Sequence, residues 1–177
     1  TWNNRVLAFD MTPDQVESGM AATHVLGQEN FESYEVATAA DRISFGTRNG
    51  RGIGPSGGRP AAMALDKINQ RLFVADGENN RVLVFDMHPN RIRSGADAIG
   101  VLGQSDFTSN ESGLNAAKFS LPGDMVMDDA NQRLFVELPF QDRILVFNVA
   151  PDTFENGMPA SWVIGQSDFT SNTPGMS

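Results

Sequence analysis

Residues 71–86 read RLFVADGENNRVLVFD, and after a loop residues 101–107 read VLGQSDF. The same pair of stretches returns at 133–148 and 163–169, so that Arg143 takes the place of Arg81. A shorter form lacks the part that corresponds to residues 71–80. It is found at 5–10 and 25–31. The spacing from Arg5 to Arg81 holds 14 more residues than that from Arg81 to Arg143, and these fall within 32–59. A regular period of this length indicates a repeat architecture.

Each repeat contains four short apolar runs bounded by polar turns. The runs are rich in Val, Leu and Phe, which is typical of strands buried on both faces. Asn and Gly in the tight turn between the second and third runs supply the positive φ that short hairpins need. We expect strands at Ala61–Leu65 and Gly123–Met127, Arg71–Ala75 and Arg133–Glu137, Arg81–Phe85 and Arg143–Phe147, Ile99–Gln104, and Arg5–Phe9 in the shorter repeat. No segment has a helical period.

Four short strands per repeat, stacked repeat against repeat, predict a β-propeller with four-stranded antiparallel blades. The strings RLFVADGENNRVLVFD and VLGQSDF resemble the NHL repeat, in the bacterial form whose fourth strand reads VLGQ and is followed by an Asp-Phe pair. The resemblance covers the chain outside residues 34–58. It implies a six-bladed propeller around a central channel.

The predicted organisation is one all-β propeller segment over residues 1–177, with about two and a half blades. Its parts are a half blade (1–31), an inserted Gly/Arg loop (32–59), a blade (60–107), a connection (108–121), a second blade (122–169) and a tail (170–177). Blade faces and sheet edges left bare are an aggregation hazard. We therefore expect the sequence to be part of a longer polypeptide, or its copies to assemble into a ring.

Composition narrows the possible partners. The chain has 22 acidic and 13 basic residues, a net charge of −9, which argues against nucleic acid and anionic membrane surfaces. Without cysteine it can form neither a disulfide framework nor a thiolate metal site. No apolar run is long enough to span a membrane, and no signal peptide opens the chain. We expect a protein outside the cytoplasm, secreted or periplasmic.

The sequence offers little for catalysis. His24 and His88 stand alone in different repeats, at unrelated positions, and we interpret both as incidental. No G-x-S-x-G motif occurs, and the glycine-rich stretch 46–58 lacks the Gly-Lys-Ser/Thr ending of a phosphate loop. The NHL resemblance includes amidating lyases that hold zinc through histidines, and related propeller hydrolases hold calcium. Asp124 is the single candidate ligand on the first strands, and one carboxylate cannot make a calcium site. We expect no cofactor, with calcium or zinc only if the intact parent is an enzyme.

A residue that recurs at the same position in every repeat is expected to stabilise the fold of the repeat. We therefore expect Arg5, Arg81 and Arg143 to make structural hydrogen bonds at the turn between the second and third strands. The aromatic residues at matching places should be buried between blades; they are Phe73, Phe85, Phe135 and Phe147, with Phe107 and Phe169 plugging between neighbours.

Two departures from the repeat point to a binding face. The polar turn 76–80 becomes Leu-Pro-Phe-Gln-Asp at 138–142, so that exposed Leu138 and Phe140 would form a contact patch; the alternative is that a neighbouring blade covers them. The other departure is the inserted loop. Loops on a rigid scaffold commonly carry binding specificity. The candidate partner-binding residues are Arg48, Arg51, Arg59, Leu138, Pro139 and Phe140.

The sequence thus predicts a non-catalytic binding or scaffolding module. Its partner would be a protein, or further blades or copies of the same propeller. The alternative is a piece of a propeller enzyme, a metal-dependent lyase or hydrolase, with channel ligands in blades outside this sequence.

Overall fold

The computed structural model describes residues 4–44 and 62–175, and this part of the chain is all-β. It contains one two-stranded and two four-stranded sheets, all antiparallel. The first sheet is β1 (Val6–Ala8) and β2 (His24–Leu26), with the 3-10 turn η1 (Pro13–Gln15) between them. The second is β3 (Met63–Asp66), β4 (Arg71–Asp76), β5 (Arg81–Asp86) and β6 (Gly100–Leu102), with η3 (Gly77–Asn79) joining β4 to β5. The third is β7 (Met125–Asp128), β8 (Arg133–Leu138), β9 (Arg143–Asn148) and β10 (Trp162–Ile164).

The predicted four-strand repeat is confirmed. Both larger sheets pair their strands in chain order, β3-β4-β5-β6 and β7-β8-β9-β10, and the first sheet has the pairing of a third and fourth strand. The register is the same in each, since Val6 opposes Leu26, Val82 opposes Leu102 and Ile144 opposes Ile164. The fourth strand is shorter than predicted, because β6 and β10 each pair over only three residues.

The tight turns have the backbone that the sequence predicted. The residue before each repeated arginine has positive φ: 47° at Asn4, 53° at Asn80 and 47° at Asp142. Asn and Asp tolerate this left-handed conformation better than other non-glycine residues. The polar residues in these turns therefore set the direction in which the third strand leaves.

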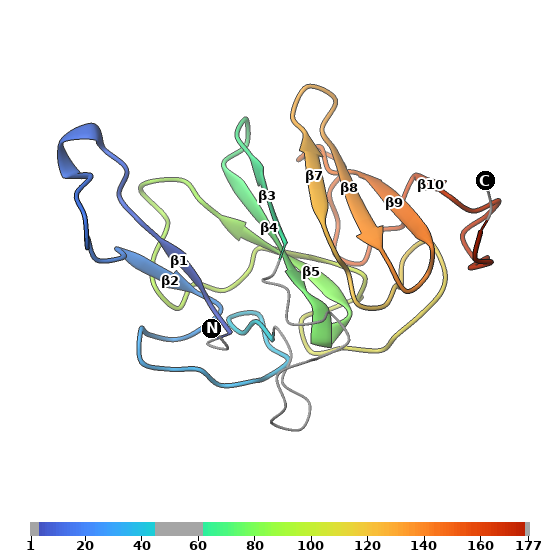
Figure 1. Cartoon of the computed structure of the whole chain (residues 1–177), viewed down its shortest axis with the longest axis horizontal. Coiled ribbons are helices and arrows are strands. Elements are labelled where there is room, and N and C mark those ends of the chain that lie inside the picture. Colours follow the sequence, from blue (N-terminus) through green and yellow to red (C-terminus); the bar gives the residue numbers. More distant parts are fainter. Residues whose placement is uncertain (1–3, 45–61, 176–177) are drawn as a thin grey trace.

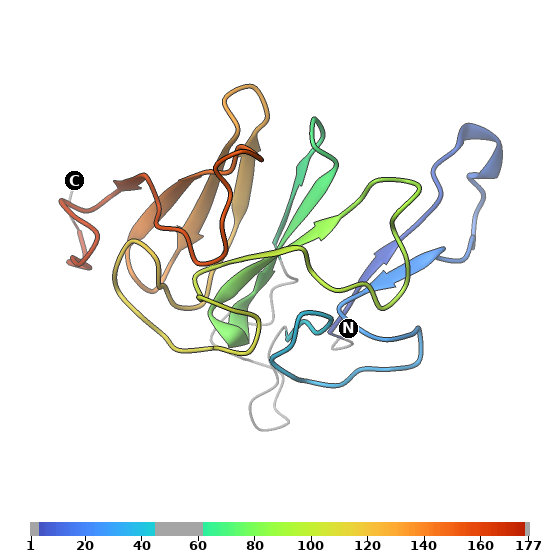
Figure 2. The ribbon, with the colours of Figure 1, turned by 180° about the vertical axis from the view of Figure 1, so that it is seen from behind.

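The three sheets lie side by side and spread like a fan, with the second in the middle (Figure 1; from behind, Figure 2). The core between the second and third sheets contains Phe73 and Phe147, with Phe119 making an edge-to-face contact with Phe147 at 6.3 Å. The core between the first and second sheets contains Phe85 and Leu26. The middle sheet is thus buried on both faces, as the continuous apolar runs predicted.

The outer faces of the arrangement differ from the middle. Phe135 was expected to be as buried as Phe73, its counterpart, but it is only half-buried because no sheet of the described residues covers its face. Trp162 and Ile164 are exposed on the same sheet, as are Leu7 on the first sheet and Phe9 directly after β1. Over residues 4–44 and 62–175, no helix has the length and apolar character needed to cross a membrane.

Candidate functional site

One end of the sheets gathers the β4–β5 and β8–β9 turns together with the long connections 27–44 and 103–121; we call it the turn face. The fourth strand runs antiparallel to the third, so it ends where the third begins. The connection that leaves the fourth strand therefore passes over the turn, as Gln104 shows by donating from Nε2 to Asn80 O at 3.0 Å. In Figure 1 both connections cross the lower end of the sheets.

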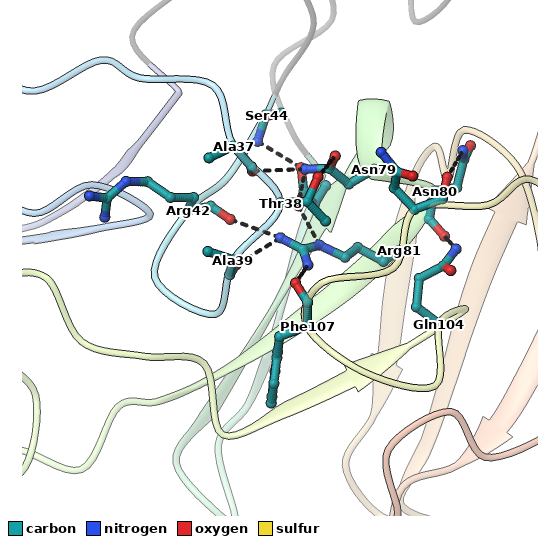
Figure 3. Close-up of polar contacts among 12 residues, drawn as sticks. Ala37, Thr38, Ala39, Arg42, Ser44, Asn79, Asn80, Arg81, Gln104 and Phe107 are labelled. Atoms are coloured by element: carbon teal, nitrogen blue, oxygen red, sulfur yellow. Dashed lines mark hydrogen bonds and ion pairs between the residues drawn. The ribbon is translucent and has the colours of Figure 1, made fainter.

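A buried ion pair organises the turn face at the second sheet (Figure 3). Arg81 Nε donates to Asp76 Oδ2 at 2.6 Å, and both side chains are fully buried. The other guanidinium nitrogens donate to three backbone carbonyls, those of Ala39, Arg42 and Phe107, at 2.8, 3.1 and 2.5 Å. The predicted structural role of this arginine is confirmed. It ties the turn to the connection before β3 and to the stretch that follows β6.

Asp76 and Asn79 complete the fastening of the first connection. Asp76 accepts a hydrogen bond from Ser44 N at 2.6 Å and Asn79 Nδ2 donates to Ala37 O at 3.2 Å, while Thr38 Oγ1 donates to Asn79 Oδ1 at 2.9 Å. Burial raises the pKa of the Asp76 carboxyl, against the lowering effects of the Arg81 charge, the Asn79 amide and the backbone N–H of Ser44. The connection is therefore held at several points up to Ser44.

In the third sheet, the turn is attached to its connection in a similar way but through different residues. Leu138 takes the place of Asp76 and Gln141 that of Asn79; Gln141 Nε2 donates to Gly113 O at 2.6 Å. Arg143 donates to the carbonyls of Phe169 and Asn115 and to Gln141 Oε1, but it has no carboxylate partner and its Nε is unpaired within the described part of the chain. Burial lowers the pKa of this guanidinium. In the first sheet, Arg5 follows the same pattern by donating to Phe31 O and Ser33 O.

The two connections are equivalent along most of their length, because hydrogen bonds of the first have counterparts in the second. Gln28 Nε2 donates to Glu35 O and Gln104 Nε2 to Glu111 O, both at 2.8 Å. Where the next fourth strand approaches, Ala98 N donates to Ala40 O at 2.9 Å, and Ala160 N donates to Ala116 O at 2.8 Å.

The extra residues of the first repeat interval can be placed in the sequence from this equivalence. Equivalent residues of the two connections are farther apart in the sequence than equivalent residues of β3 and β7. The stretch between the first connection and β3 is therefore longer than the stretch between the second connection and β7. The 14 extra residues therefore fall after Ser44 and before Pro60. Arg48, Arg51 and Arg59 lie in this stretch, outside the described residues.

The apolar β8–β9 turn divides into a buried and an exposed half. Leu138 is fully buried in the core between the second and third sheets, so the prediction that it is exposed is wrong. Leu138 is the last residue of β8 and lies on a buried face of the third sheet. Its counterpart Asp76, the last residue of β4, is likewise buried in the second sheet. Pro139 and Phe140 are exposed, and Phe140 shows 54% of its surface. The proposed contact patch of this turn is thus reduced to Pro139 and Phe140.

No metal centre is assembled by the described residues. Asp124 is exposed, and its backbone N–H donates to Glu137 Oε2 at 3.2 Å. Nowhere in residues 4–44 and 62–175 do three or more carboxylate or imidazole groups come together in a way that could hold an ion. His24 in β2 and His88 in the loop after β5 are both half-buried; the ring of His24 contacts the Thr23 hydroxyl, and His88 Nδ1 accepts a hydrogen bond from Asn90 N.

The Asp-Phe-Thr-Ser stretches form aspartate-centred turns after β6 and β10. At Asp168 the backbone N–H of Thr170 and the hydroxyls of Thr170 and Ser171 lower the pKa to about 2. The pKa of Asp106 is lowered in the same way through Thr108 and Ser109. In both stretches, backbone N–H and hydroxyl donors that follow the aspartate are used in these local hydrogen bonds.

These turns predict a measurable acid dependence. Because the pKa of Asp168 is lower in the folded chain than its unfolded value of about 3.9, its stabilising contribution is complete above pH ~4 and is lost as the pH falls toward 2. Titration of the carboxyl carbon by NMR should give a midpoint near 2. Thr170→Val with Ser171→Ala should raise it. A wild-type midpoint near 4 would contradict the hydrogen bonding described.

Comparison with known proteins supplies no family: no family model matches the chain, and no curated protein resembles it closely enough to count as a relative.

Proposed function

We propose that the chain is a segment of an NHL-type β-propeller that acts as a binding module through its turn face. The propeller assignment is supported by the repeated four-stranded antiparallel sheets, by their face-to-face packing and by the VLGQ-x-D-F motif that carries the NHL resemblance. In this assignment the second and third sheets are blades, and the first is the outer half of one.

The observation that carries the binding role is an exposed aromatic residue on a rigid base. Phe140 is 54% exposed, although the turn that holds it is fixed from below by buried Leu138 and by Gln141, which bonds the second connection. An aromatic side chain presented by a fixed backbone loses little entropy on binding and is a frequent anchor of protein interfaces. The equivalent turn in the second sheet, residues 77–80, has no aromatic residue.

The extra residues of the first repeat interval are joined in the sequence to this face through Ser44. The stretch starts immediately after Ser44, whose N–H is held by Asp76, and it ends before β3. Arg48, Arg51 and Arg59 lie outside the described residues, and we keep them in this proposal as basic candidates for partner binding on the basis of the sequence. The arginines of this stretch would attract acidic groups on a protein partner, whereas the net charge of −9 disfavours nucleic acid.

Peptide selection tests this proposal without knowledge of the natural partner. A phage-displayed peptide library is selected on the immobilised chain, and the enriched peptides are titrated against variants. Most should bind Phe140→Asn at least tenfold more weakly, a loss of about 1.4 kcal/mol. The matched control is Asp152→Asn, an exposed change on the loop at the opposite end of the third sheet, which should leave affinity unchanged. Peptides that ignore Phe140 and depend on Asp152 would overturn the assignment of the face.

A further inference from the structure

A second interaction surface lies at the other end of the sheets, in the loop between the third and fourth strand of each repeat. Each loop contains a tight turn with a small polar residue followed by glycine: Ser18-Gly19, Ser94-Gly95 and Asn156-Gly157. The glycines have φ of 82°, 68° and 68°, a conformation that glycine adopts without strain. We call these the polar-Gly turns.

The polar-Gly turn of the third repeat binds the edge of the second sheet. Gly157 N donates to Val101 O at 3.0 Å, and Asn156 Oδ1 accepts from Val101 N at 3.0 Å. Val101 is the middle residue of the edge strand β6. The turn thus pairs both backbone groups of one edge residue, which would otherwise be open to association with another strand.

The polar-Gly turn of the second repeat makes the same two bonds one sheet earlier. Gly95 N donates to Val25 O at 3.1 Å, and Val25 N donates to Ser94 Oγ at 3.2 Å. Val25 is the middle residue of β2, as Val101 is of β6. The second and third repeats therefore each fasten to the sheet before them through a polar-Gly turn.

Close approach explains why these positions hold glycine. A Cβ atom on Gly157 would lie 2.9 Å from Gln104 O and from Ser105 Cα, and one on Gly95 would lie 2.9 Å from Glu29 O. All three separations are below ordinary van der Waals contact, and the obstacles are backbone atoms that cannot rotate away.

Among the described residues, one polar-Gly turn has no fourth strand to bind, and one fourth strand has no polar-Gly turn. Ser18 and Gly19 are exposed, and a Cβ on Gly19 would meet no atom within 4 Å. At the opposite end of the fan β10 is an edge strand, with Val163 in the position of Val101, and no polar-Gly turn of the described residues lies against it. Figure 1 shows β1–β2 and β10 at opposite ends of the arrangement.

The outer face of the third sheet and the outer face of the first sheet also match each other as the two sides of one interface. Ile164, on the outer face of the third sheet, is 49% exposed, whereas its counterpart Leu102 is fully buried against the third sheet. Leu7, on the outer face of the first sheet, is 41% exposed, whereas its counterpart Leu83 is fully buried against the first. Each exposed face thus has apolar residues at positions whose counterparts are buried between two neighbouring sheets of this chain.

The sizes of two facing residues, one on the fourth strand and one on the incoming loop, indicate which loop fits the third sheet. On the second sheet, the Phe154 ring of the incoming loop lies against Gly100, with the Arg71 guanidinium 5.7 Å from its centre. On the third sheet the Gly100 position is Trp162, and its own ring lies 4.9 Å from Arg133, the counterpart of Arg71. Trp162 therefore occupies the space that an incoming phenylalanine would need.

The loop of the first repeat has the smaller residue that this space requires. The position of Phe154 is taken there by Val16, which is 50% exposed and two residues before the unused polar-Gly turn. The second and third loops are already seated on β2 and β6. We propose that a second copy of this chain docks head to tail, with its Ser18-Gly19 turn on Val163 and its Val16 beside Trp162.

Sedimentation velocity on the 177-residue chain, from low micromolar to several hundred micromolar, tests the proposal. The wild-type mass should rise above 19.2 kDa toward its multiples as concentration increases. Gly19→Val should weaken association at least tenfold, because the added side chain is strained at φ 82° and meets the edge backbone. Gly175→Val is the matched control, since Gly175 has φ 77° and open space around it in the tail, and it should associate like wild type.

A steric exchange provides the second arm. Val16→Phe should weaken association, since the larger ring meets Trp162, and adding Trp162→Gly should restore it by recreating the Phe154–Gly100 fit. In hydrogen exchange, the Val163 amide should be protected increasingly with concentration in wild type but not in Gly19→Val. A 19.2 kDa monomer over the whole range would overturn the proposal. Equal association of Gly19→Val and Gly175→Val, or of Val16→Phe and wild type, would do the same.

Discussion

Replacing Arg81 by leucine is expected to lower the free energy of unfolding by about 3–5 kcal/mol, the usual cost of leaving one member of a buried ion pair without its partner. Asp76 would keep its bonds from Ser44 N and Asn79 Nδ2, but its fully buried carboxylate would lose the guanidinium. The carbonyls of Ala39 and Phe107 would lose a charged donor as well. Urea denaturation followed by fluorescence measures the loss.

An exposed ion pair in the same sheet is the control. Arg91 Nε donates to Asp86 Oδ2 at 2.5 Å, with 60% of the arginine side chain exposed. Arg91→Leu should change the unfolding free energy by less than about 1 kcal/mol, because exposed pairs are screened by water. Equal effects of the two substitutions would contradict the view that the Asp76–Arg81 pair holds the turn face together.

Phe85→Ala is expected to cost about 3–5 kcal/mol, since the ring is fully buried between the first and second sheets and its removal leaves a cavity. Such a loss is a large part of a typical stability of about 5–15 kcal/mol. The matched change Phe140→Ala removes the same atoms from an exposed position and should leave the urea midpoint nearly unchanged. An unaltered midpoint for Phe85→Ala would mean that the two sheets do not pack as described.

The strands and their order could be predicted from the sequence because local and repeated signals agree. In the RLFVAD and RVLVFD runs of the second sheet, successive residues face different neighbouring sheets, so the alternation of apolar and polar residues disappears. The regular spacing, which brings Arg143 to the place of Arg81, then carried the assignment from the second sheet to the third. Both arginines were correctly assigned a structural role for the same reason.

Burial at individual positions could not be predicted, because it depends on which sheet covers which face. Leu138 was expected at the surface because its counterpart is the polar Asp76, yet both positions face the core; in one a leucine packs there, and in the other a paired carboxylate. Phe135 and Phe73 are equivalent in sequence but not in exposure, since only Phe73 has a sheet in front of it.

The fastening of the connections could not be predicted either. The bonds run from side chains such as Gln104 and Asn79 to backbone carbonyls, and carbonyls carry no sequence signal. The three glycines of the polar-Gly turns were visible in the sequence, but the partners of two of them are backbone groups of the preceding sheet. A repeat comparison restricted to small residue pairs in loops would have found the turns, though not what they bind.

The central claim, that partners bind at the turn face, is tested most directly by mapping the amide shifts of the isotopically labelled chain as a selected peptide is added. The largest changes should fall at Phe140 to Asp142 and in residues 34–44 and 108–121 of the two connections. Changes concentrated at the opposite end, in the loops 87–99 and 149–161 or at the β3–β4 and β7–β8 turns, would contradict it.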